Sequence, residues 1–234
     1  MLAVAEIVYV MLGFGAGLIA VGTLAVFFPN MRDVVVMLLV VNLPAEAYIV
    51  FKERKTIRWR GLLLLMVGIA VGIPTGTWLL KTTDLHFLLS VLGLLLVVFG
   101  ILFFAAGFRN WNIEHMKRSK WGEPFIGAIA GALAGMFGTG GPPLIAYFQI
   151  IGAKKALFRA NLMACFFFFT IVRAPSYVVS GLITQERLVS SLLVLPAVLL
   201  GAVIGNSIHV RISEKRFKQV VSLTITAIGV VLLV

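Results

Sequence analysis

The sequence predicts an all-α polytopic membrane protein made of two inverted repeats, each a re-entrant broken-helix hairpin followed by three transmembrane helices. Three observations indicate this fold class. Hydrophobic residues make up 61% of the 234 positions and charged residues only 12%, which is more apolar surface than a water-soluble domain needs. The apolar residues form eight long segments, and the glycine pattern of the first half of the chain recurs in the second half.

The eight apolar segments are separated by short connections that carry most of the charged residues. Each segment is long enough to cross a bilayer at ~1.5 Å of rise per residue. The segments cover residues 2–29, 34–51, 61–80, 85–107, 124–151, 156–182, 187–209 and 217–234. Because the basic residues behind the net charge of +11 lie mainly in these connections, we attribute them to orientation in the membrane and exclude nucleic acid as a partner.

Glycine pairs spaced four residues apart recur along the chain. The pair that begins at Gly72 recurs 129 residues later at Gly201, and the pair that begins at Gly13 recurs 118 residues later at Gly131. Such internal symmetry is typical of membrane proteins built from two similar halves. We therefore divide one domain into a first membrane repeat over 1–108, a basic cytoplasmic linker over 109–120 and a second membrane repeat over 121–234.

The basic loop residues distinguish two topologies. If all eight segments cross the membrane, ten basic loop residues lie on one side and nine on the other. If 2–29 and 124–151 are instead hairpins that enter and leave on the same side, sixteen lie on one side and only Arg32, Lys81 and Arg187 on the other. The second topology follows the positive-inside tendency. It also gives each half an odd number of crossings, so the two halves are inverted.

The stretch Gly131–Gln149, GALAGMFGTGGPPLIAYFQ, is apolar yet cannot form one regular helix. Glycine weakens a helix by about 1 kcal/mol and an interior proline by about 3 kcal/mol. The proline pair after Gly-Thr-Gly-Gly therefore predicts a break followed by the first turn of a new helix. For Gly131 and Gly135 the alternative is close helix packing through small residues.

We expect the break to form a ligand site, because its backbone amides have no helical partner and a helix start favours an anion. The residues predicted to contribute are Gly138, Thr139, Gly140 and Gly141. A methyl group at Gly140 is expected to block the approach of the anion to the backbone. The stretch lacks the lysine and the strand of a nucleotide-binding phosphate loop.

Arg173 is the second candidate feature of this site. It lies 14 residues from Arg159 and 14 from Arg187, so ~21 Å of helix separates it from either interface. A charge at that depth is costly and marks a pathway by default, and the guanidinium fork suits an anion with three oxygens. The alternative is a structural ion pair with a neighbouring span.

Glu46 and Asn161 are further polar positions inside predicted spans. Glu46 is a candidate to pair with Arg173 or to couple transport to protons; the alternative is a carboxylate that reaches toward the cytoplasmic face near Lys52. Asn161 is a candidate substrate ligand, with a hydrogen bond between helices as the alternative. No nucleophile–base set or metal-ligand cluster is recognisable, so we predict no enzymatic activity, no metal and no cofactor.

The glycine-rich stretch and a fainter first copy resemble the sulfite exporter TauE/SafE family of membrane permeases. Members of that family carry two copies of a motif, roughly Gly-xxx-Gly-xx-Gly-x-Gly-Gly with a proline close behind, one opening each half. The second copy here comprises Gly131, Gly135, Gly138, Gly140, Gly141 and Pro142. In the first copy, Gly22 and Thr23 stand where a fuller glycine run is usual.

The resemblance implies a multi-pass protein of the bacterial inner membrane that moves sulfite, a C2 sulfonate or a related small organosulfur anion, mostly outward. Gly22 and Thr23 would then join the substrate site. We expect alternating access in which one hairpin-bearing half rocks against the other, with protons as a candidate coupling ion and a homodimer as a candidate assembly. The alternatives are an anion channel with the same site and a membrane assembly or sulfur-relay protein.

The topology is testable with introduced cysteines in intact cells. Lys55→Cys, Arg118→Cys and Lys155→Cys should resist a membrane-impermeant thiol reagent, because all three positions are cytoplasmic in the hairpin topology, whereas Thr83→Cys should react. Labelling of Arg118→Cys and Lys155→Cys from opposite sides would show that 124–151 crosses the membrane fully.

Overall fold

The structure is a computed structural model that describes residues 21–22, 24–26, 30–108, 122–151, 155–193, 195–196 and 214–233. The chain divides into two compact units. The first unit consists of residues 1–34, 83–112 and 194–234, and the second consists of 35–82 and 113–193. Each unit combines segments of both predicted repeats. The repeat boundaries themselves stay a prediction.

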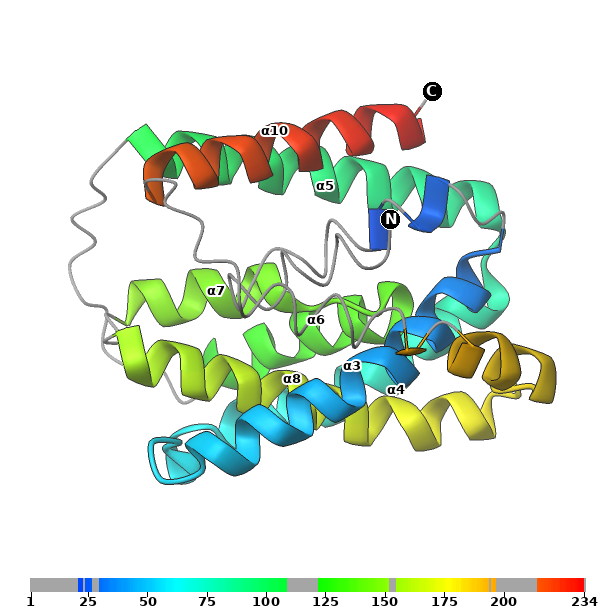
Figure 1. Cartoon of the computed structure of the whole chain (residues 1–234), viewed down its shortest axis with the longest axis horizontal. Helices are drawn as coiled ribbons and strands as arrows, with labels where there is room; N and C mark the ends of the chain where they lie inside the picture. Colours follow the sequence, from blue (N-terminus) through cyan, green and yellow to red (C-terminus); the bar gives the residue numbers. More distant parts are fainter. Residues whose placement is uncertain are drawn as a thin grey trace. The chain divides into compact units, whose positions relative to one another are not determined.

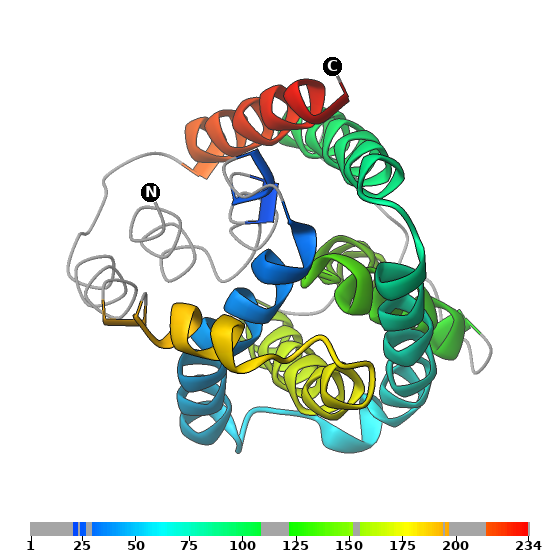
Figure 2. The ribbon, with the colours of Figure 1, turned by 90° about the vertical axis from the view of Figure 1, so that its right-hand side faces the viewer.

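The regular elements of the described chain are helical. In the second unit they are α3 (Met31–Glu53, which begins in the first unit), the short 3₁₀ helix η1 (Trp59–Gly61), α4 (Leu63–Thr82), α6 (Gly122–Phe137), α7 (Gly141–Ile150) and α8 (Lys155–Val179). In the first unit they are α5 (Leu85–Phe108) and α10 (Glu214–Leu233), which lie side by side in both Figure 1 and Figure 2.

Four described helices are long and apolar enough to cross a membrane: Met31–Glu53, Leu63–Thr82, Leu85–Leu102 and Leu157–Val179. Their outward positions also carry large apolar side chains, such as Val71 and Trp78 on α4, which are 64% and 60% exposed. Exposure of this kind suits lipid rather than water as the surrounding solvent. The chain is thus a polytopic helical membrane protein. The count of eight segments stays a prediction, because 2–29 and 187–209 lie largely outside the described residues.

The α4–α6 pair is the tightest contact of the second unit. Gly68, Gly72 and Gly76 recur every fourth residue on α4, and Gly127, Gly131 and Gly135 do so on α6. A Cβ atom at any of these positions would run into a backbone carbonyl of the facing helix; at Gly131 it would lie 2.6 Å from the carbonyl oxygen of Ile69. The two backbones therefore touch directly, as small-residue stripes allow in membranes. Gly131 and Gly135 serve this packing.

Glycines also bring together α5 and α10 in the first unit. A Cβ at Gly93 would lie 2.9 Å from the carbonyl oxygen of Gly229, and one at Gly229 would lie 2.7 Å from that of Gly93. Gly22 lies against the same pair, because a Cβ there would meet Leu96 at 2.9 Å and Ile228 at 2.8 Å. Gly22 is thus a close-packed position of the first unit.

The predicted break in the glycine-rich stretch separates α6 from α7. Phe137 ends α6, and Gly141 begins α7 with two prolines in its first turn. The chain then turns back along α6, because the Tyr147 hydroxyl donates a 2.7 Å hydrogen bond to Oε1 of Glu123, in the first turn of α6. Figure 1 shows the two helices together with α8. The stretch is therefore a hairpin of two short helices.

Gly72→Ala tests the direct backbone contact. Alanine would stabilise an isolated helix by about 1 kcal/mol relative to glycine, but here the added methyl meets the Ala128 backbone. We expect a net loss of about 1–3 kcal/mol, as for overpacked cores, measured by unfolding in detergent. Val71→Ala, on the exposed side of the same helix, is the control and should change stability little. A stabilised Gly72→Ala protein would contradict the contact.

Candidate functional site

Arg173 is fully buried in the second unit, with 1% of its surface exposed. Nη1 donates to the carbonyl oxygen of Ala134 at 3.5 Å, and Nη2 donates to Oγ1 of Thr170 at 3.4 Å. Among the described residues, Nε meets no hydrogen-bond acceptor. Both hydrogen bonds are longer than the usual 2.7–2.9 Å or so of charge-assisted bonds. The guanidinium is therefore held in place but poorly satisfied, which is unusual for a buried charge.

Glu46 faces this guanidinium through Thr170. The threonine hydroxyl donates a 2.6 Å hydrogen bond to Oε2 of Glu46 and accepts the bond from Arg173. Glu46 is 3% exposed and Thr170 is 1% exposed. Within the described chain, no direct ion pair joins Arg173 to Glu46. The structure therefore brings the two predicted charges together, with one hydroxyl group between them.

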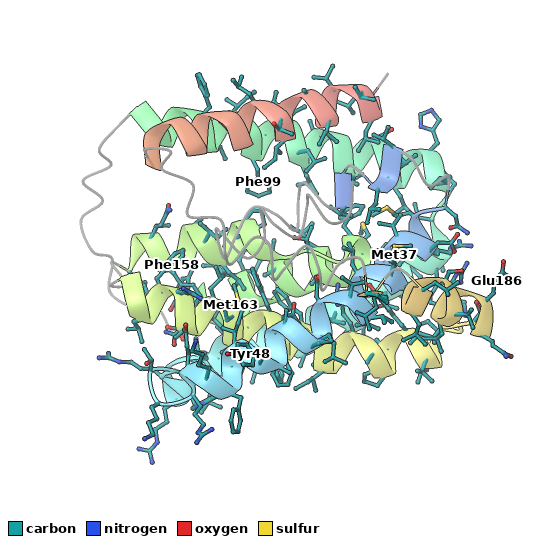
Figure 3. All side chains as sticks on the ribbon, in the orientation of Figure 1. Met37, Tyr48, Phe99, Phe158, Met163 and Glu186 are labelled. Atoms are coloured by element: carbon teal, nitrogen blue, oxygen red, sulfur yellow. The ribbon has the colours of Figure 1, made fainter. Side chains whose placement is uncertain are left out.

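Glu46 does not extend toward Lys52. The carboxylate is turned to α8, whereas the ammonium group of Lys52 lies 5.8 Å from the centre of the exposed Tyr48 ring, at the outer surface of α3. Figure 3 labels Tyr48 on α3 and the buried Met163 on α8. Of the sequence-based alternatives for Glu46, its place beside Arg173 is the one that the structure contains.

The hairpin break lies against the guanidinium. Gly138 has a φ of 75°, a left-handed conformation that suits glycine, and a Cβ there would lie 3.2 Å from Nη1 of Arg173. The Gly138 amide donates to the carbonyl oxygen of Ala134 at 2.9 Å. The expectation of a free amide at Gly138 is therefore wrong, because this amide closes the last turn of α6.

The next three amides remain available. For Thr139, Gly140 and Gly141 the described chain contains no hydrogen-bond acceptor, and Gly140 is the residue that precedes the ten-residue helix α7. Helix starts leave amides without helical partners and carry a partial positive charge. The break thus presents amides and a guanidinium in the same part of the second unit.

The end of α6 supplies the acceptors for α8. Ala134 and Gly135 belong to its last turn, and the Ala134 carbonyl also accepts the 2.9 Å bond from the Gly138 amide. Arg173 contacts the first carbonyl, and the Tyr177 hydroxyl donates to the second at 2.9 Å. A cation at this position also complements the negative end of the helix dipole. Arg173 and Tyr177 therefore cap the C-terminus of α6 from the side.

Gly140 has a packing role. A Cβ there would collide with the carbonyl oxygen of Ala130 and would lie 2.9 Å from the Phe169 ring. The space on this side of Gly140 is thus filled by the protein itself, and the hairpin needs glycine here to pack. The approach of an anion to the Gly140 backbone stays a prediction.

Two other predicted site residues lie elsewhere. Oδ1 of Asn161 accepts a 3.1 Å hydrogen bond from the Arg58 amide and so holds the α3–α4 connection. Asn161 precedes Arg173 by twelve residues, or ~18 Å along α8. The structure therefore does not bring Asn161 to the guanidinium. Its hydrogen bond joins two segments of the chain, which corresponds to the alternative considered for it. Gly22 belongs to the first unit, and Thr23 lies outside the described residues.

Sequence reasoning missed Thr170, Tyr177 and the buried Glu123–Tyr147 pair. The spacing of Thr170, Arg173 and Tyr177 places them on one face of α8, so the arginine itself was a signal for its two neighbours. The hairpin bond between Glu123 and Tyr147 has no such local signal. Among the described residues, no group of three or more histidine, cysteine or acidic side chains is arranged to hold a metal ion.

Comparison with known proteins identifies the chain. The family model described as "Sulfite exporter TauE/SafE" matches residues 1–232, nearly the whole length. The chain belongs to this family. It is accordingly a multi-pass membrane transporter and not an enzyme.

Two curated relatives cover most of this TauE/SafE chain. One, from Cupriavidus necator, is named a probable sulfite/organosulfonate exporter, TauE; it is 26% identical over 198 residues, which is 83% of this chain and 76% of the relative. The other, from Comamonas testosteroni, is named a probable inner membrane transporter protein, TsaS; it is 25% identical over 182 residues, 75% of this chain and 72% of the relative. No solved structure matches the chain significantly.

Gly140→Ala tests the packing role of the break without any ligand. The added methyl meets the Ala130 backbone and the Phe169 ring, so we expect a loss of about 1–3 kcal/mol in the free energy of unfolding. Gly141→Ala is the matched control, because its Cβ would lie 3.3 Å from the movable Phe166 ring. If the two variants are equally stable, the packing role of Gly140 is wrong and only a ligand-related role is left for it.

Proposed function

We propose that the protein is a secondary transporter that exports a small organosulfur anion, such as sulfite or a C2 sulfonate, and that the anion binds at Arg173 beside the α6–α7 break. The observation that supports this most is the buried guanidinium, whose two hydrogen bonds are long and whose Nε meets no acceptor in the described part of the chain. A charge removed from water is costly unless it is well paired. An anion would supply the missing pairing.

The chemistry of the site favours an anion with several oxygens. The planar fork of arginine binds two oxygens of one group at once. The amides of Thr139, Gly140 and Gly141, at the positive end of α7, would donate hydrogen bonds to a third oxygen. Gly138 brings the break close to the guanidinium, since a Cβ there would lie 3.2 Å from Nη1. Sulfite and sulfonate groups carry three oxygens.

The relatives support the same substrate class. One carries sulfite and organosulfonate in its name, and the other is named for the inner membrane. We extend both features to this chain and place it in a bacterial inner membrane. The outward direction is proposed on the same basis.

The hairpin supports a re-entrant topology and alternating access. Because Tyr147 of α7 reaches Glu123 at the start of α6, a hairpin inserted in a bilayer would enter and leave by the same face. Discontinuous helices that meet near the midplane, in two inverted halves, are a known transporter design. The residues 1–108 and 121–234 would form these halves, and access to the site would alternate between the two sides.

Arginine variants test the site. Arg173→Ala should abolish the thermal stabilisation of the purified protein by sulfite and by methanesulfonate. Arg173→Lys should retain the charge but lose the fork, and weaken binding by roughly tenfold, or ~1.4 kcal/mol. Arg159→Ala is the control on the same helix, since that arginine is exposed and pairs with Glu53. Binding by Arg173→Ala with unchanged affinity would move the anion elsewhere.

Proteoliposomes distinguish a transporter from a channel. A transporter should accumulate labelled anion transiently when the vesicles are loaded with unlabelled anion, because exchange is coupled through one site. The Arg173→Ala protein should lose this counterflow. A steady anion current without counterflow would identify a channel instead.

A further inference from the structure

The charge of the candidate site is balanced when Glu46 is ionised. Arg173 contributes one positive charge, and Glu46 one negative charge when ionised; each is almost fully buried. The groups that face Glu46 from α8 are Thr170 and Arg173, and Tyr177, one turn further, donates to Gly135. On α6, the Ala134 carbonyl accepts from Arg173. Among the described residues, Arg173 is the charged group that acts on Glu46.

The hydroxyl of Thr170 links the carboxyl group of Glu46 to the guanidinium of Arg173. A hydroxyl group has one proton to donate and two lone pairs to accept with. Thr170 gives its proton to Glu46 at 2.6 Å and offers a lone pair to Arg173 at 3.4 Å. An ionised Glu46, which can only accept, can take this bond. A protonated Glu46 could donate to Thr170 instead, and the threonine proton would be released for another acceptor.

An anion at Arg173 upsets this balance. Site and anion together would carry a net negative charge inside an apolar protein, where like charges repel strongly because little water screens them. Addition of one proton to the Glu46 carboxylate removes the excess charge. It also frees the threonine proton to point at the anion. Proton and anion therefore favour each other at this site.

We propose that the anion and one proton bind together, the proton on Glu46, with Thr170 as the positioning residue between the carboxylate and the guanidinium. The proposal rests on the proposed function, because it takes Arg173 as the anion site. The proton comes from solvent water and converts the carboxylate to a carboxylic acid; no other bond forms or breaks. The transported unit for a monovalent anion is thus electroneutral.

Thermodynamic reciprocity gives the pH dependence. If anion binding draws in one proton, added protons must tighten anion binding by the same factor. The dissociation constant should then fall by about tenfold per pH unit as the pH is lowered, over the range where Glu46 is ionised in the free protein and protonated in the bound one. The coupling between proton and anion depends on the Thr170 hydroxyl, because this group orients the carboxylate.

Titration calorimetry measures the proton directly. Methanesulfonate is titrated into the purified protein in two buffers that differ in ionisation enthalpy; its sulfonate keeps one negative charge at every pH used. We expect uptake of about one proton per anion in the wild-type protein. Glu46→Gln should still bind the anion but take up none. Glu123→Gln, which alters another buried carboxylate, is the control and should behave as wild type.

Thr170 variants separate a positioning role from a structural one. Thr170→Val keeps the side-chain volume but removes the hydroxyl, so the carboxylate loses its stabilising hydrogen bond and is protonated before the anion arrives. We expect its proton uptake to fall and its pH dependence to flatten. Thr170→Ser restores the hydroxyl and should restore both. A Thr170→Val protein with wild-type uptake would remove Thr170 from the coupling.

The outcomes are distinguishable from failure of the proposed function. If neither methanesulfonate nor sulfite binds, the anion site and the coupling are both wrong. If only sulfite binds, its own titration cancels in the difference between wild type and Glu46→Gln, which should again be about one proton. If an anion binds with no proton uptake, or if Glu46→Gln takes up as many protons as wild type, the coupling is wrong and the anion site stands.

Discussion

Burial of the Arg173 charge is the constraint on which the rest of the second unit depends. A guanidinium inside an apolar protein needs acceptors. At the end of α6 the Ala134 carbonyl accepts from Arg173 in addition to the Gly138 amide. The break after Phe137 also leaves amides at the start of α7. One interruption thus places an acceptor of the guanidinium and backbone donors in the same part of the second unit.

The glycine stripes offset part of the free-energy cost of this break. Helical hydrogen bonds are lost between α6 and α7, but the α4 and α6 backbones gain dispersion contacts where they touch. The hairpin is fixed further by the bond from Tyr147 to Glu123 and by that from Tyr177 to Gly135. These contacts hold the hairpin against α4 and α8.

Sequence alone predicted the features that depend on chain order. Composition predicted the membrane class, residue counting predicted the burial of Arg173, and glycine and proline chemistry predicted the break. Features that depend on tertiary contacts were missed. The Gly138 amide closes the last turn of α6, Gly140 packs closely against α6, and Thr170 acquires its contacts only because α3 places Glu46 opposite it. Such partners cannot be derived from local spacing.

The direct contact of the α4 and α6 backbones has a mechanical consequence. Motion between packed helices normally proceeds by small rotamer changes at their interface, but a glycine that touches the facing backbone has no rotamer to change. Small sliding adjustments of α4 against α6 are therefore disfavoured at these six glycines, because a displacement of either backbone there presses directly on the other.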